Sequence, residues 1–204
     1  LGMKVIPYET YLEQNLSLPI PGEHNKQNFA ASLGVIGALD KPVEAARSHL
    51  SKEFKGAKRR MEYLGMTELG SLILDDYAHN PEGLAYLIEG LRDFYPDKKI
   101  IMLFEPHLYS RTRDFKEAFG EVLSTVDVLY LFPTYRAREA QIPEEDFLLK
   151  DFIDTESVEL IVVDDPKNFH TDFNNIGYGK DYLVISAGAG DIWKYSKSLK
   201  KTTH

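Results

Sequence analysis

The 204 residues are 43% hydrophobic and 12% aromatic, a composition typical of a folded protein with a sizeable core and not of a disordered chain. The formal net charge of −8 argues against a general binding surface for nucleic acids or anionic membranes. Cysteine is absent, which excludes disulfides, thiolate metal sites and a cysteine nucleophile.

The chain begins at Leu1 rather than at a methionine, as expected of a piece of a longer protein. Two short apolar pieces within residues 1–18 are predicted to be strands. Residues 25–39 repeat small and apolar side chains at helical spacing, and Pro42 restarts a second helix through residue 50. A Lys-rich, polar composition follows, so we place a domain boundary between residues 52 and 53.

The rest of the chain predicts an α/β fold. Residues 61–66 and 71–74 form a predicted hairpin, and Asn80-Pro81 predicts a helix start with an N-cap and a proline at the first position. Predicted helices cover residues 81–94, 112–124, 144–153, 166–174 and 190–200, and they alternate with apolar strands at 99–104, 127–132, 158–163 and 181–186. This alternation predicts a mostly parallel, Rossmann-like sheet of about six strands with helices on both faces.

Four polar segments directly follow predicted strands and should therefore share the carboxyl edge of the sheet. They cover residues 75–79, 105–113, 133–139 and 186–191. The first three bring carboxylates, imidazoles, tyrosines and arginines, and the fourth brings a glycine turn whose amides open a helix and could face an anion. Together they suggest a site for a carboxylate or phosphate ligand. The simpler interpretation is that single loop charges are solvated, and that Asp75 and Asp76 hydrogen-bond their own turn.

A second candidate lies in the first predicted helix, where Asn25 and Asn28 fall on one face near its start. A side-chain amide offers a donor and an acceptor side by side, which suits an adenine edge. Simple capping of the helix is the alternative.

Several other classes are disfavoured. The sequence contains no Gly-x-Ser-x-Gly elbow, and its six histidines form no pair at helical metal-ligand spacing, so no metal site is expected in this chain. The segments around Gly188 and Gly177 fit neither a dinucleotide fingerprint nor a P-loop. No apolar run approaches the roughly 20 residues that a bilayer requires, and no signal peptide is evident. We therefore expect a cytoplasmic protein without nucleic-acid or membrane partners.

Six motifs occur in order between Gly22 and Ile192. They are Gly22-x-His24-Asn25-x-x-Asn28, Phe54-x-Gly56-x-x-Arg59-Arg60-x-Glu62, Asp75-Asp76-Tyr77-Ala78-His79-x-Pro81, Pro106-His107-x-Tyr109-Ser110-Arg111-Thr112-Arg113-Asp114, Tyr135-x-Ala137-x-Glu139 and Gly188-Ala189-Gly190-Asp191-Ile192. Together they resemble the Mur ligases of peptidoglycan synthesis, and most closely the members that add L-alanine to UDP-N-acetylmuramate.

The resemblance implies ATP-dependent amide formation, in which the substrate carboxylate becomes an acyl phosphate that the amine of an amino acid attacks. It implies ATP and Mg²⁺, with UDP-N-acetylmuramate and L-alanine as small-molecule partners. Residues 1–52 would be the end of the central ATP-binding domain, a small α-helical and β remnant, and residues 53–204 the C-terminal domain. The P-loop and most metal ligands would lie upstream, so this chain alone is expected to be inactive.

The resemblance also assigns roles to individual residues. Residues expected to bind ATP are Asn25 and Asn28 at the adenine, Arg60 at the phosphates and Asp76 at the ribose hydroxyls. Residues expected to bind the amino acid are Tyr77, His79, His107 and Arg111, with Arg111 at its carboxylate. None is expected to act as a nucleophile.

Three residues depart from the pattern of the alanine-adding enzymes. Asn80 stands where they commonly have a second histidine, Leu108 where some have arginine, and Glu105 where glutamine is frequent. The identity of the added amino acid is thereby left open. Two alternatives are a related murein tripeptide recycling ligase and a non-catalytic α/β module that binds a small acidic metabolite.

Overall fold

The computed structural model describes residues 5–12, 18, 23–53 and 57–201. The chain divides into two compact units, Leu1–Ala57 and Lys58–His204. Among the helices in these described ranges, none is both long and apolar enough to cross a bilayer.

The first unit is helical where it is described. It contains the 3-10 helix η1 (Tyr8–Tyr11) and the helices α1 (Glu23–Ala38) and α2 (Val43–Glu53), which confirms the predicted helix pair. Phe29 and Leu33 of α1 form its small core with Leu18, and partly buried side chains of α2 pack against them. α2 continues to Glu53, so the first polar residues after residue 50 are part of this helix and not of a connection.

The strands predicted within residues 1–18 are wrong where the structure describes that segment. Residues 8–11 form the 3-10 helix η1, and the predicted pieces otherwise lie in residues 1–4 and 13–17, outside the described part. Tyr11 explains the difference, because its ring packs against the glycines of α1: a Cβ on Gly34 would lie 3.6 Å from the ring and one on Gly37 only 2.7 Å from the hydroxyl. The apolar residues of this segment thus serve helix packing.

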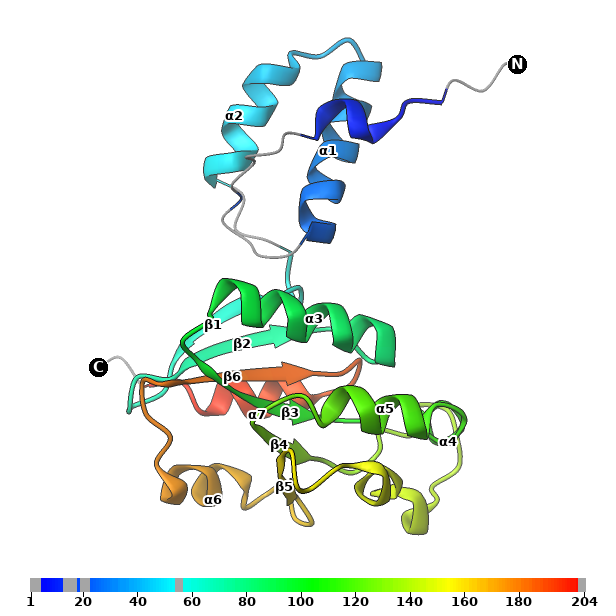
Figure 1. Ribbon diagram of the computed structural model, residues 1–204, viewed down its shortest axis with the longest axis vertical. Coiled ribbons are helices and arrows are strands. Elements are labelled where there is room, and N and C mark those ends of the chain that lie inside the picture. Colours follow the sequence, from blue (N-terminus) through cyan, green and yellow to red (C-terminus); the bar gives the residue numbers. More distant parts are fainter. Residues whose placement is uncertain (1–4, 13–17, 19–22, 54–56, 202–204) are drawn as a thin grey trace. The chain divides into compact units, whose positions relative to one another are not determined.

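The second unit is built on one six-stranded sheet in the order β1-β2-β6-β3-β4-β5 (Figure 1). Its strands are β1 (Glu62–Met66), β2 (Leu72–Asp76), β3 (Lys99–Phe104), β4 (Val128–Leu131), β5 (Glu159–Val162) and β6 (Tyr182–Ala187). β1 and β2 form the predicted antiparallel hairpin, and all other pairs are parallel. The predicted mostly parallel α/β sheet is confirmed.

Helices cover both faces of this sheet, as predicted. They are α3 (Pro81–Phe94), α4 (Tyr109–Asp114), α5 (Lys116–Leu123), α6 (Phe169–Ile176) and α7 (Ile192–Ser198). Successive side chains of a strand point to opposite faces. Leu74 therefore joins the core under α3 and α5, whereas its neighbour Ile73 joins the core under α6 and α7.

The helix predicted over residues 112–124 is in fact two helices, α4 and α5, that meet at Phe115. Tyr109 anchors α4 through a hydrogen bond from its hydroxyl to Asp146, whereas Phe119 and Leu123 of α5 lie in the core shared with α3. The two segments therefore pack against different parts of the protein, and the helix is interrupted at Phe115 between them.

The helix predicted near residues 144–153 consists of two 3-10 helices, η2 (Pro143–Glu145) and η3 (Leu148–Phe152). A backbone carbonyl in its middle is already used, because Asp146 accepts hydrogen bonds from the amide and hydroxyl of Thr134, both at 3.1 Å. The amide of Lys150 bonds instead to the carbonyl of Phe147 at 3.0 Å. This i to i+3 bond is the one that defines a 3-10 turn.

The strand register brings the predicted polar loops to one edge. Ala187 at the end of β6 lies opposite both Asp76 and Phe104, and Phe104 lies opposite Leu131. The loops that follow β2, β3, β4 and β6 therefore leave the sheet side by side, and we call this edge the rim. At the first of them, Asn80 caps α3 by accepting the amide of Gly83 at 2.7 Å, as predicted.

Replacing Gly120 by alanine is expected to destabilise the second unit by about 1–3 kcal/mol, the usual cost of overpacking a core. A Cβ on Gly120 would contact the carbonyl of Phe152, whose carbon lies 2.9 Å away, and this outweighs the helix propensity of alanine. Urea denaturation measures the loss. Gly179→Ala is the matched control, because its Cβ would meet nothing closer than 3.9 Å. Equal stabilities of the two variants would contradict the packing argument.

Candidate active site

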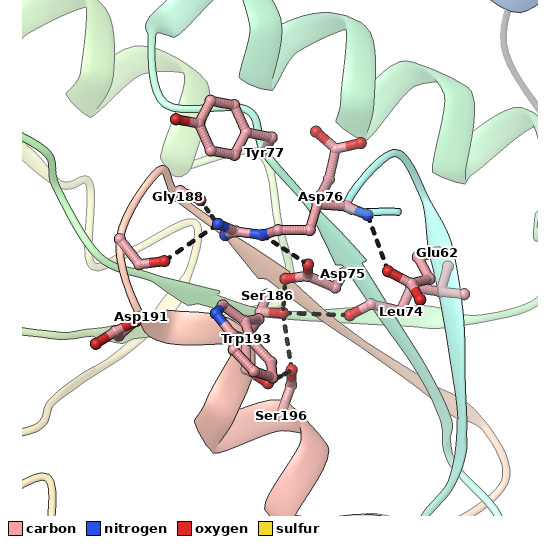
Figure 2. Close-up of polar contacts among 12 residues, drawn as sticks. Glu62, Leu74, Asp75, Asp76, Tyr77, Ser186, Gly188, Asp191, Trp193 and Ser196 are labelled. Carbon is pink, nitrogen blue, oxygen red and sulfur yellow. Dashed lines mark hydrogen bonds and ion pairs between the residues drawn. The ribbon is translucent and has the colours of Figure 1, made fainter. Parts of the chain in front are cut away.

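The centre of the rim is a buried carboxylate at the end of β2. Asp75 is 1% exposed and its Oδ2 accepts a hydrogen bond from Nε of Arg59 at 3.1 Å (Figure 2). Its Oδ1 accepts from the hydroxyl of Ser186 at 2.5 Å, and that hydroxyl also contacts the hydroxyl of Ser196 at 2.8 Å. Burial raises the pKa of Asp75, although the hydrogen bond from Ser186 and the charge of Arg59 act in the opposite direction.

Arg59 connects this carboxylate to the glycine turn after β6. Its Nη2 donates to the carbonyl of Gly188 at 2.6 Å and its Nη1 to the carbonyl of Gly190 at 3.2 Å. The guanidinium also lies over the ring of Tyr77, 4.9 Å from its centroid (Figure 2). Sequence reasoning gave Arg59 no role. The available signal was Asp75, because a carboxylate at the end of a buried strand requires a cation.

Asp76 is also buried, with 7% of its surface exposed. Its Oδ1 accepts the amide of Ala78 at 2.7 Å and its Oδ2 the amide of Met61 at 2.9 Å. Asp76 therefore organises its own turn, as the simpler interpretation held. Contact with ribose hydroxyls stays a prediction.

One amide after the glycine turn, which the sequence suggested could face an external anion, is occupied within the chain. The amide of Asp191, at the start of α7, donates to Oε2 of Glu105 at 2.9 Å. A Cβ on Gly190 would collide with the same carboxylate, so the two loops are closely packed. Burial raises the pKa of Glu105 to about 7, against the hydrogen bond from Asp191. The chain thus supplies its own carboxylate at this helix start.

Four aromatic rings from three loops form a continuous run across the rim. The ring centroids of Tyr77 and His79 are 5.2 Å apart, those of His79 and His107 are 5.9 Å apart, and those of His107 and Tyr135 are 5.6 Å apart in a stacked arrangement. The structure therefore brings together three of the residues predicted to bind an amino acid. Tyr135, the fourth ring, was not among them.

Arg111 lies close enough to this run to act on it electrostatically. Burial, followed by the charges of Arg111 and His79, lowers the pKa of His107. Within the described part of the chain, Nη1 of Arg111 and Nδ1 of His107 are buried and have no hydrogen-bond partner. Oε2 of Glu145 is a third such atom. Buried polar atoms are nearly always paired, so the atoms of Arg111 and His107 are candidates for contact with a ligand.

A family model described as Mur ligase, glutamate ligase domain, matches residues 59–190. The chain belongs to the Mur ligase family. Solved structures agree on the fold: a UDP-N-acetylmuramate-alanine ligase from Thermotoga maritima has a TM-score of 0.72 at 22% identity, over 89% of this chain and 38% of its own. A type C pseudomurein peptide ligase from Methanothermus fervidus has a TM-score of 0.65 at 17% identity, over 89% and 36%. The MurF ligase from Thermotoga maritima, solved with ADP, has a TM-score of 0.61 at 25% identity, over 87% and 39%. This chain therefore spans less than two fifths of each.

The residues of this Mur ligase chain that were predicted to bind ATP lie in both units. Arg60 is exposed and lies 5.8 Å from the Tyr77 ring centroid in the second unit. Asn25 and Asn28 lie on α1 of the first unit, where Asn28 is exposed and its carbonyl accepts the hydroxyl of Ser32 at 2.8 Å. Their roles at a nucleotide stay predictions.

Mg²⁺ would accompany ATP, but the part of this Mur ligase chain that the structure describes contains no group of three or more acidic or histidine residues able to hold a metal ion. Such a group is what an all-protein metal site requires, whereas Mg²⁺ bound together with nucleotide phosphates uses only one or two carboxylates. We assign no metal-dependent step to them.

Arg59→Met is expected to destabilise the second unit by about 3–5 kcal/mol, because it leaves the buried carboxylate of Asp75 without its cation. Urea denaturation at pH 8 provides the measurement. Arg113→Met is the control: Arg113 is half-exposed and pairs with Glu145 at 3.6 Å, so its loss should cost at most about 1 kcal/mol. If both variants lose the same small amount, the Arg59 contact does not hold the rim.

Glu105→Gln is expected to stabilise the protein more at pH 8 than at pH 5. The folded-state pKa of Glu105 is raised from 4.5 to about 7, so the contribution of this group to wild-type stability is largest below pH 4.5 and is lost as the pH rises through 7. Glutamine removes this loss, and at 1.36 kcal/mol per pKa unit the gain should be about 2–3 kcal/mol larger at pH 8. Thermal denaturation at both pH values tests this. Glu121→Gln, at an exposed position of α5, is the control.

Proposed function

We propose that this chain is the amino-acid-binding part of an ATP-dependent ligase that joins L-alanine to UDP-N-acetylmuramate through an acyl phosphate. Residues 1–52 would belong to its ATP-binding domain and residues 53–204 to its C-terminal domain. The observation that carries the proposal is the buried Nη1 of Arg111, which has no hydrogen-bond partner within the described residues and belongs to a side chain whose charge lowers the pKa of His107 in the aromatic run.

An amino acid fits this arrangement because it presents a carboxylate and an amine a short distance apart. The guanidinium of Arg111 would bind the carboxylate through parallel hydrogen bonds, which fixes both place and direction. The lowered pKa of His107 favours the neutral imidazole, which can accept a proton or a hydrogen bond from the amine. Tyr77 and His79 would complete the pocket. Binding and orientation supply most of the catalysis in such a reaction, so no nucleophile is required of this chain.

ATP would be bound between the groups predicted for it and a P-loop, which this sequence does not contain. Asn25 and Asn28 would face the adenine, Arg60 the phosphates and Asp76 the ribose. The phosphate-binding loop must come from another segment. We therefore expect the 204 residues alone to form no amide bond, and the ligase that combines them with a P-loop domain to do so.

The choice of L-alanine is supported by the motif after β3, Tyr109-Ser110-Arg111-Thr112, and not by the fold, which the chain shares with the Thermotoga maritima alanine ligase. A murein peptide ligase from Psychrobacter arcticus shares the fold as well, with a TM-score of 0.59 at 20% identity. Product mass spectrometry with ATP, UDP-N-acetylmuramate and a panel of L-alanine, glycine, L-serine and the murein tripeptide separates the two. Preference for the tripeptide would replace the alanine assignment, and the absence of any product would overturn the ligase itself.

Arg111→Lys in the complete ligase is expected to lower kcat/KM for the amino acid roughly ten- to a hundredfold, because lysine keeps the charge but loses a hydrogen bond to a carboxylate worth about 1.5–3 kcal/mol. Steady-state kinetics with each substrate varied in turn provides the test. The KM values for ATP and the sugar nucleotide should change little. Arg113→Lys, two residues along, is the control. Equal damage to the ATP and amino-acid parameters would contradict the carboxylate role.

A further inference from the structure

The helix that carries Arg111 has no cap of its own. α4 begins after Leu108, an apolar residue that supplies no side-chain acceptor and whose φ is +72°. The first amides of a helix have no partner within it, so those of Tyr109 and Ser110 need an acceptor from elsewhere. The position of Arg111 therefore depends on what binds the start of α4.

Glu139, from the loop after β4, supplies that acceptor. Its Oε2 accepts the amide of Tyr109 at 2.5 Å, and both of its oxygens lie 3.3 Å from the amide of Ser110. Hydrogen bonds from Ser110 and Tyr109 lower the pKa of Glu139, so the carboxylate is charged at neutral pH. A carboxylate at this end also complements the helix dipole.

The same loop holds the other side of this segment. The carbonyl of Tyr135 accepts the amide of Leu108 at 2.9 Å, and the amide of Tyr135 donates to the carbonyl of Pro106 at 2.7 Å. The Tyr135 ring stacks on His107 with an angle of 23° between the ring planes. Glu139 is fixed in turn by its amide, which donates to the carbonyl of Arg136 at 2.9 Å. Residues 106–110 are thus bound at several points by residues 135–139.

We propose that Glu139 is a positioning residue of the amino-acid site: by binding the first amides of α4 it sets the place of Arg111 relative to His107. The inference rests on the proposed function. Without Glu139, the start of α4 after the strained residue Leu108 would lose its hydrogen-bond acceptor, and the side chain of Arg111 would no longer be held at a fixed position relative to the aromatic run. A merely stabilising cap would lower the melting temperature and leave amino-acid recognition unchanged.

Kinetics of the complete ligase tests the positioning role. Glu139→Ala is expected to raise KM for the amino acid about tenfold, as expected when a bound charge loses a well-placed hydrogen bond. The KM for ATP should stay unchanged. Glu139→Gln keeps one acceptor oxygen and should recover most of the loss. Glu121→Ala, exposed on α5, is the control. A lowered melting temperature with an unchanged amino-acid KM would overturn the proposal.

A measurement on the 204-residue chain keeps this inference separate from the ligase assignment. In ¹⁵N NMR spectra, the Nε–H signal of Arg111 should broaden or exchange faster with solvent in Glu139→Ala and stay near its wild-type state in Glu139→Gln. An unchanged Arg111 signal in Glu139→Ala would overturn the positioning role even if the ligase is active. A changed signal with no ligase activity would instead support the positioning role and reject the proposed function.

Discussion

A buried carboxylate needs hydrogen-bond donors or a cation in place of water. At the end of β2 this requirement organises the rim. Asp75 binds Ser186 of the adjacent strand and Arg59 of the segment before β1. Arg59 also binds the carbonyls of Gly188 and Gly190, and its guanidinium lies over the ring of Tyr77. One buried charge therefore joins the entry to the hairpin, the end of β2 and the turn after β6, and it fixes the first ring of the aromatic run.

Internal carboxylates then decide which positive groups of the rim remain available to a ligand. Glu105 accepts an amide at the start of α7, and Glu139 accepts two at the start of α4. The first amides of both helices are thereby occupied by side chains of the protein itself. Arg111 and His107 keep buried atoms that the described residues do not satisfy. In the proposed ligase, selectivity for a carboxylate and an amine would depend both on the helix amides that Glu105 and Glu139 already occupy and on the unsatisfied atoms of Arg111 and His107.

The fold by itself does not choose the amine. It is shared by proteins named as an alanine ligase and as a pseudomurein peptide ligase, at identities of 22% and 17%. In the proposed ligase, the choice of amine would therefore depend on the loops of the rim, which include Tyr135 and Glu139. The departures at Asn80, Leu108 and Glu105 fall in these loops, and the structure gives two of them clear local tasks: Asn80 caps α3 and Glu105 caps α7.

Local patterns determined most of the sheet and the approximate position of the site. Apolar runs of strand length, the cap at Asn80 and the alternation of strands with helices depend on near neighbours, so the sequence alone predicted the strands, α3 and the shared rim with Tyr77, His79 and His107. The tertiary structure decided what depends on distant partners. The break between α4 and α5 follows from the bond of Tyr109 to Asp146 and from the packing of α5 in the core. The 3-10 geometry near Asp146 follows from its contact with Thr134. The role of Arg59 follows from hydrogen bonds to carbonyls 129 and 131 residues away. These atoms come within reach only when β2 and β6 pair in the folded sheet.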